Sequence, residues 1–158
     1  MVMPIDTDRL ILIVTGSTLR AEMADRPIAE TLRSRMFAWR DGEHPHADPP
    51  GAPNARPYDV VICSDLWYLN DESLHLLPTV SVGGPGVNAA AAHLADKTPS
   101  AFVVDDTLIV QMDPELRNLQ ASVWGMDNET TLRAMDVFLD RYLDQFMRAA
   151  DERLTAVA

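Results

Sequence analysis

The chain has 158 residues, a formal net charge of −11 and a single cysteine, Cys63. This length suits one domain with a core that needs no disulfide, and one cysteine excludes an internal disulfide bond. Only one lysine, Lys97, is present, and nucleic-acid binding needs clustered basic residues, so we expect no nucleic-acid partner. The N-terminal residues lack the basic flank and apolar core of a signal peptide, and no apolar run reaches membrane-spanning length. We therefore expect a cytoplasmic protein with no membrane partner.

The first expected elements are a buried strand and an amphipathic helix. Residues 10–14 form the unbroken apolar run LILIV, which is typical of a strand covered on both faces. The strand ends in a turn of glycine and hydroxyl side chains: Thr15, Gly16, Ser17 and Thr18. A helix is predicted after it, with Asp25 as N-cap and Pro27 near its first position, because apolar residues recur at helical spacing as far as Trp39.

Residues 41–57 are dense in proline and small polar side chains. Such a composition does not hold a regular element, so we expect a mobile surface loop. His44 and His46 lie in this segment in an H-x-H spacing. Two imidazoles could share a metal ion, but no cysteine or third histidine is near them in the sequence, and we predict no metal site.

The second predicted strand covers residues 58–63. It leads into Ser64, Asp65 and Trp67, so a hydroxyl, a carboxylate and an aromatic ring follow a strand end. In an open α/β sheet, the carboxyl ends of the strands line the crevice in which ligands bind. We therefore include these three residues in a candidate ligand site.

The same strand end carries the residue types of a nucleophilic site. Cys63 is the nucleophile in that interpretation, with His75 or His93 as the base and Asp65 to orient the base. A cysteine in a strand also serves as a small buried hydrophobic residue, and the G-x-S-x-G elbow of many hydrolases is absent. The sequence therefore assigns no catalytic residue.

The stretch at residues 79–95 predicts a strand, a sharp turn and a short helix. The turn is built from residues that allow or fix unusual backbone angles: Gly83, Gly84, Pro85 and Gly86. Asn88 is the expected N-cap of the helix at residues 89–95. The free N–H groups of that helix would suit a carboxylate or phosphate. The alternative is a close strand–helix connection without a ligand, because neither common nucleotide-binding glycine motif is present.

Two strands joined by a tight turn are predicted next, at residues 100–104 and 107–112. Asp105 and Asp106 form the turn, and turn composition explains this pair as well as an ion site would. A last short strand, residues 121–124, ends at Gly125.

The longest predicted helix begins with Asp127 as its N-cap and covers residues 127–150, with a continuation to about residue 154. Its length of about 40 Å exceeds what a short strand needs for cover, so its far end is expected to overhang the sheet. Phe146 and Met147 would then be exposed, and a second copy of the chain would protect them. The alternative is that the tail after about Ala149 frays and the apolar stripe is buried within the monomer.

Two short motifs occur at strand ends about forty residues apart. The first, G-G-P-x-V-N, consists of Gly83, Gly84, Pro85, Val87 and Asn88. The second, G-x-D-x-x-x-T-x-x-A, consists of Gly125, Asp127, Thr131 and Ala134. Together they resemble the Rossmann-like domains of archaeal S-layer proteins and related cell-surface repeats, over about a third of the chain. The resemblance implies a layered α/β domain that is used structurally or as a binding module.

Together these elements predict one three-layer α/β domain over residues 1–158, Rossmann-like or flavodoxin-like. We expect about five or six mostly parallel strands, helices on both faces, and an antiparallel hairpin at residues 101–112. Four Gly-rich or polar turns that each follow a strand would form one crevice. Its candidate ligand-binding residues are Thr15, Gly16, Ser17, Thr18, Ser64, Asp65, Trp67, Gly83, Gly84, Gly86, Asn88, Gly125 and Asp127.

Two functions stay open from the sequence. The first is a non-catalytic binding or assembly module that forms a homodimer through its last helix. The second is an enzyme or a nucleotide- or flavin-type binder that acts on a small anionic ligand in the crevice. In that second interpretation, the turn at residues 15–18 would hold a phosphate and Trp67 or Tyr68 would stack on a ring. The sequence names no cofactor for either function.

Overall fold

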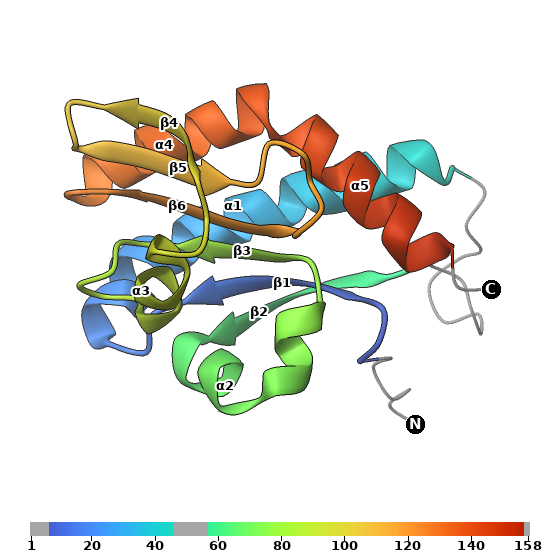
Figure 1. The fold of residues 1–158 in the computed structure, drawn as a ribbon, viewed down its shortest axis with the longest axis horizontal. Helices are drawn as coiled ribbons and strands as arrows, with labels where there is room; N and C mark the ends of the chain where they lie inside the picture. Colours follow the sequence, from blue (N-terminus) through green and yellow to red (C-terminus); the bar gives the residue numbers. More distant parts are fainter. Residues whose placement is uncertain (1–6, 46–56, 157–158) are drawn as a thin grey trace.

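The computed structural model describes residues 7–45 and 57–156, which build one six-stranded sheet (Figure 1). The strands are β1 (Leu10–Thr15), β2 (Asp59–Ser64), β3 (Thr79–Val82), β4 (Ser100–Val104), β5 (Leu108–Met112) and β6 (Gln120–Gly125). They lie in the order β2-β1-β3-β6-β5-β4. The first four are parallel, and β5 is antiparallel to both of its neighbours. This arrangement confirms the predicted mostly parallel sheet with an antiparallel hairpin.

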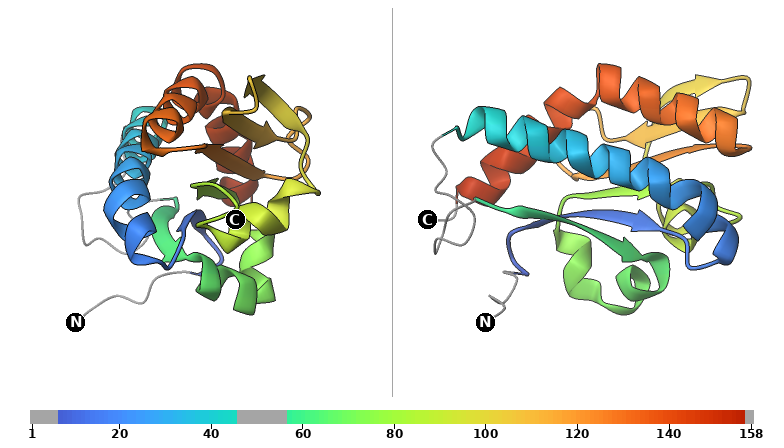
Figure 2. Two further views of the ribbon diagram at one scale, coloured as in Figure 1. Left: turned by 90° about the vertical axis from the view of Figure 1, so that its left-hand side faces the viewer. Right: turned by 180° about the vertical axis from the view of Figure 1, so that it is seen from behind.

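Helices cover both faces of the sheet and complete the three predicted layers (Figure 2). One face carries α1 (Leu19–Glu43), α4 (Asn128–Arg141) and α5 (Leu143–Thr155). The other carries α2 (Asp65–Asn70) and α3 (Ala89–Ala95), with the short 3-10 helix η1 (Glu72–Leu76). Within the described part of the chain, no helix combines the length and apolar character needed to cross a membrane.

The first strand explains why the core has two halves. Ile11 and Ile13 pack into the cluster beneath α1, α4 and α5, whereas Leu10, Leu12 and Val14 pack into the cluster on the opposite face. All five are buried. Successive side chains of a strand point to opposite faces, so only a strand buried on both sides needs an unbroken apolar run.

Helix α1 begins seven residues earlier than predicted. Thr18 is its N-cap, and its hydroxyl accepts a hydrogen bond from the Ala21 N–H at 3.2 Å. Asp25, the predicted cap, instead lies inside the helix and is buried. Pro27 is also inside the helix, but it lies on the exposed side, as does Met23, whose carbonyl the missing N–H would have served. Water can bind that carbonyl, which explains why the proline is tolerated.

The C-terminal end of α1 also differs from the prediction. The helix continues through Glu43, so the expected loop at residues 41–57 is wrong for its first three residues. Residues 46–56, which include His46, lie outside the described part of the chain.

The predicted C-terminal helix is two helices. Tyr142 separates α4 from α5 with a φ of −123°, and α5 runs at an angle to α4 across the sheet (Figure 2). Because the chain bends there, α5 keeps facing the core instead of continuing past it. Phe146 and Met147 are 0% exposed. The expected overhang with an exposed apolar stripe is therefore wrong. The stripe is buried within the monomer, as the alternative predicts, but the expected fraying after Ala149 is also wrong, because α5 continues to Thr155.

The parallel register places the carboxyl ends of four strands side by side. Thr15 pairs with Ser64, Val14 with Ser81, and Val82 with Val123. The four predicted turns therefore share one edge of the sheet. The β4–β5 turn reaches the same edge, because Leu108 pairs with Gly125. Asp105 and Asp106 in this turn have positive φ angles of 47° and 56°, and the Thr107 N–H donates to the Val104 carbonyl at 2.9 Å, as in a type I′ turn.

Candidate functional site

The polar turn residues at this edge are helix N-caps. Each uses a side-chain oxygen to accept a hydrogen bond from the first turn of the helix that follows its strand: Thr18 for α1, Ser64 for α2, Asn88 for α3 and Asp127 for α4. A cap satisfies N–H groups that the helix leaves free. The caps predicted at Asn88 and Asp127 are confirmed. Capping also explains why a hydroxyl, amide or carboxylate follows each of these strands.

Asn88 has a second role at the centre of the sheet edge. Its Oδ1 accepts from the N–H groups of Ala90 and Ala91, at 2.9 and 3.4 Å. Its Nδ2 donates to the carbonyls of Val14 and Val82, at 3.1 and 2.9 Å, and to the hydroxyl of Ser81 at 3.0 Å. The amide therefore joins the ends of β1 and β3 and leaves no group free for a ligand.

A carboxylate of the protein fills the predicted anion site at α3. One oxygen of Asp65 accepts from the Ala89 N–H at 2.8 Å, and the other accepts from the Leu66 N–H at 2.8 Å and from the Ser17 hydroxyl. Gly16 packs so closely that a Cβ there would lie 1.8 Å from the Val87 carbonyl oxygen. Strand order reverses between β1 and β3, where open α/β sheets bind ligands. Here the chain itself occupies that position.

An open cavity of about 240 Å³ lies nearby at the same edge, between the first turns of α1, the turn after β3 and the start of α4. Its lining residues are Arg20, Ala24, Asp25, Gly84, Pro85, Gly86, Val87, Trp124, Gly125, Met126, Asp127, Asn128 and Thr131. Four of the predicted ligand-binding residues belong to this set: Gly84, Gly86, Gly125 and Asp127. We take this cavity as the candidate site and call it the α1–α4 cavity.

Asp25 is the unusual group of the α1–α4 cavity. It is 6% exposed, and no described residue donates a hydrogen bond to its carboxyl group. Burial raises the pKa of Asp25, and the nearby charge of Arg20 partly opposes that shift. Gly83 makes room for the carboxyl group, since a Cβ at this position would lie 2.6 Å from Asp25 Oδ2. Gly83 also has a φ of +104°, which favours glycine.

The other charged groups of the cavity are one arginine and one carboxylate. Arg20 is exposed and forms no ion pair within the described residues. Asp127 has a lowered pKa, chiefly because the backbone N–H of Thr130 donates to its carboxylate, and it stays ionised. Trp124 contributes an aromatic wall, and no described group accepts a hydrogen bond from its buried indole N–H.

Nine of the predicted ligand-binding residues do not line this cavity: Thr15, Gly16, Ser17, Thr18, Ser64, Asp65, Trp67, Gly83 and Asn88. Trp67 is 63% exposed and lines a second cavity of about 460 Å³, together with residues 7–9 and 76–78. Those segments precede β1 and β3, so this cavity lies toward the amino ends of the strands. Its four charged residues all interact with other groups: Asp71 accepts from Ser73, Arg153 donates to the Arg117 carbonyl, and Asp8 and Arg9 are also engaged. We therefore see no unsatisfied polar group there that would select a ligand.

The proposed nucleophilic site is not assembled. Cys63 is buried, and burial raises the pKa of its thiol to about 11, so it is not a thiolate at neutral pH. His75 Nε2 contacts the Tyr68 carbonyl at 2.8 Å and its ring lies against the Tyr68 ring. Asp65 is held by the groups described above. None of the described contacts joins the cysteine to a histidine base.

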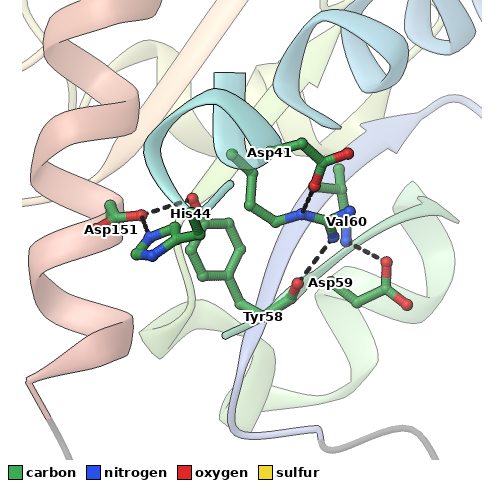
Figure 3. A network of polar contacts seen from close by, with 7 residues as sticks. Asp41, His44, Tyr58, Asp59, Val60 and Asp151 are labelled. Carbon is green, nitrogen blue, oxygen red and sulfur yellow. Dashed lines mark hydrogen bonds and ion pairs between the residues drawn. The ribbon is translucent and has the colours of Figure 1, made fainter. Parts of the chain in front are cut away.

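A polar network at the other end of α1 fastens three elements together (Figure 3). His44 Nε2 and the Tyr58 hydroxyl both contact Asp151 Oδ2, at 2.7 and 3.0 Å. The buried Arg40 donates to the Tyr58 carbonyl at 3.0 Å and to Asp41 at 3.0 Å. Burial and the Asp151 carboxylate raise the pKa of Tyr58. These contacts bind the end of α1, the start of β2 and α5 to one another.

Within the ranges that the structure describes, no three His, Cys, Asp or Glu side chains lie close enough to hold a metal ion. Asp105 and Asp106 are exposed turn residues, and His44 is engaged by Asp151.

The sequence interpretation missed Arg20 and Asp25 as site residues. A signal for Asp25 was present, since it lies three, seven and eleven positions before Ile28, Leu32 and Met36, on the buried stripe of α1. An acid in an apolar helical stripe indicates a buried carboxyl group. The prediction assigned Asp25 to a cap instead, because a proline follows it.

The resemblance to S-layer domains stays a prediction. Comparison with models of known protein families and with curated proteins finds no match for this chain.

Proposed function

We propose that this protein is a non-catalytic binding module whose ligand site is the α1–α4 cavity. The observation that carries the proposal is Asp25, a buried carboxyl group that lines the cavity and accepts no hydrogen bond from a described residue. Burying an unpartnered carboxyl group costs free energy. A bound ligand that donates to Asp25 would recover that free energy.

The order of the strands also favours a ligand site at the carboxyl edge of the sheet. The strand order β2-β1-β3-β6 is that of a flavodoxin-like sheet, in which ligands bind at the carboxyl ends of the strands. Caps and the chain itself occupy the reversal between β1 and β3, as described above. The α1–α4 cavity is the open part of that edge.

The nucleotide or flavin alternative has less support. The turn at residues 15–18 would have to hold a phosphate, but Ser17 donates to Asp65 and Thr18 caps α1. Trp67, one of the two rings considered for stacking, lines the other cavity.

A cytoplasmic location is supported only by the single, buried Cys63. Homodimerisation through the last helix has lost its original support, because the stripe on α5 is buried.

A blocked cavity tests the proposal. A Cβ at Gly86 would meet no atom within 4 Å, so Gly86→Trp should fill the cavity without backbone strain. Gly42→Trp is the matched control, since a Cβ at Gly42 also meets no atom and Gly42 does not line the cavity. We expect ligand-observed NMR with a fragment library to give hits for the wild type and Gly42→Trp that Gly86→Trp loses. Hits that Gly86→Trp retains, or no hits at all, would refute the cavity as a ligand site.

A further inference from the structure

The α1–α4 cavity presents two opposite charges that do not pair with each other. Asp25 and Arg20 both line it, from positions five residues apart on α1. Side chains five positions apart on a helix point about 140° away from each other. Neither group forms an ion pair with a described residue. Within the described part of the chain, Asp25 therefore lacks a contacting cation and Arg20 lacks a contacting anion, and both line the same small cavity.

A purely anionic ligand would meet repulsion here. The helix N-terminus that opens toward the cavity is that of α4, and the ionised Asp127 already caps it. Asp25 adds a second carboxyl group, whereas Arg20 is the one cation among the lining residues. With both carboxyl groups ionised, the lining carries an excess of negative charge, and a ligand that includes a cation is favoured.

The walls and the volume limit the rest of the ligand. Pro85, Val87, Trp124 and Met126 supply apolar surface. The cavity volume of about 240 Å³ is below the range of roughly 300–1,000 Å³ that is usual for sites of drug-sized ligands. Such a space suits a small molecule with two charged groups and a short apolar body. The indole ring of Trp124 can also attract a cation through its face.

We infer that the α1–α4 cavity binds a small zwitterion of the free amino acid class, with its ammonium group on Asp25 and its carboxylate on Arg20. This inference rests on the proposed function and names the ligand class of that site. The apolar walls would contact the amino acid side chain. Asp25 then gains the donors that the free protein does not supply.

Calorimetric titration with the twenty standard L-amino acids tests the class. For the tightest of them, two analogues are compared: the amine that lacks the carboxylate and the acid that lacks the ammonium group. We expect each analogue to bind about ten- to hundredfold more weakly than the amino acid, because each loses one charged contact. Equal binding of the amine, or tighter binding of the acid or of inorganic phosphate, would overturn the inference.

Two variants test which side chain binds the ammonium group of the ligand and which binds its carboxylate. Asp25→Asn should weaken amino acid binding by about ten- to hundredfold, whereas it should strengthen binding of the acid analogue, because the repulsion between two carboxylates is lost. Arg20→Gln should weaken amino acid binding, whereas it should strengthen binding of the amine analogue, because the repulsion between two cations is lost. A variant that weakens all three ligands equally would indicate loss of cavity structure and would contradict the assignment.

The pH dependence gives an independent readout. The ammonium contact needs an ionised Asp25, and burial raises the pKa of Asp25, so affinity should fall on acidification at a higher pH than an ordinary aspartate would cause. The other ionisable lining groups are Arg20 and Asp127; the first stays charged, and the lowered pKa of Asp127 keeps it ionised. Asp25→Asn should abolish this dependence, and a persisting dependence would contradict the role of Asp25.

The outcome also separates this inference from the proposed function. If no amino acid binds, but fragments bind the wild type and not Gly86→Trp, the ligand class is wrong and the site stands. If no fragment depends on Gly86, both the class and the site are refuted.

Discussion

At the scale of single residues, Asp25 lowers the stability of the protein without a ligand. Its carboxyl group is buried against the backbone of Gly83 and receives no hydrogen bond from the described residues. Burial disfavours the ionised form, which is why the pKa of Asp25 rises. Groups placed at a binding site for their partner are often less favourable for the empty fold than a neutral side chain of the same shape.

We expect Asp25→Asn to stabilise the free protein at neutral pH by roughly 1 kcal/mol, because the amide keeps the shape of the carboxylate but removes a charge whose burial is disfavoured. A raised folded-state pKa means that the native state binds more protons than the unfolded chain, in which aspartate titrates near about 3.9. The stability that protonated Asp25 gives the folded protein is therefore fully present below that pH. It is lost as the pH rises through the folded-state pKa of Asp25, where the buried carboxyl group ionises.

Urea unfolding of wild type and Asp25→Asn from pH 3 to 8 would measure this difference, which should grow from acid to neutral pH. Glu22→Gln is the matched control, because Glu22 is an exposed acid on the same helix. Its effect should stay within about 0.5 kcal/mol. A less stable Asp25→Asn at pH 7 would mean that the carboxylate is paired in solution.

At the scale of elements, the carboxyl edge of the sheet depends on caps that also join neighbouring elements. Asn88 caps α3 and bridges β1 to β3, and Asp65 connects the end of β2 to the start of α3. α3 has seven residues, too few to be stable by itself. Its position is therefore set by these polar contacts and by the burial of Ala90, Ala91 and Leu94.

Two substitutions at Asn88 separate capping from bridging. Aspartate caps a helix about as well as asparagine, but it cannot donate to the carbonyls of Val14 and Val82. We expect Asn88→Asp and Asn88→Ala both to destabilise the protein by roughly 2–4 kcal/mol in chemical denaturation, since buried acceptors lose their donor. Ser64→Ala, which removes a cap without a bridge, should cost about 1 kcal/mol. Wild-type stability of Asn88→Asp would show that the bridge contributes nothing.

At the scale of the whole molecule, α5 closes the core that α1 and α4 begin. Phe138 of α4 and Phe146 of α5 meet edge to face, with ring centroids 6.0 Å apart. Both rings are 0% exposed, as is Met147. The apolar stripe of the last helix is thus part of the monomer core, and it is not a surface for a second copy.

Phe146→Ala should lower the free energy of unfolding by about 3–5 kcal/mol, because it leaves a cavity in a packed core. The thermal midpoints of the wild type and the variant should not depend on protein concentration through this surface. Leu132→Ala on α4 is a suitable control, because Leu132 is 47% exposed. Calorimetry over a wide range of protein concentrations would measure these midpoints. If the midpoint of the wild type rises with concentration and the midpoint of Phe146→Ala does not, the dimer would be supported instead.

The sequence by itself determined the class of the fold, the order of its strands along the chain and several local features. The run at residues 10–14, the hairpin turn at Asp105–Asp106 and the caps at Asn88 and Asp127 all follow from patterns within a few residues. Four of the residues that line the α1–α4 cavity were also found in this way, because glycines and caps mark the ends of parallel strands.

Only the tertiary structure decided what those ends face. It fills the N-terminus of α3 with Asp65, buries Phe146 behind a bend at Tyr142, and places Asp25 in a cavity although it resembles a cap. Local patterns encode backbone conformation, which depends on neighbouring residues. The partner of a side chain depends on contacts between residues far apart in the chain, and no local pattern records them.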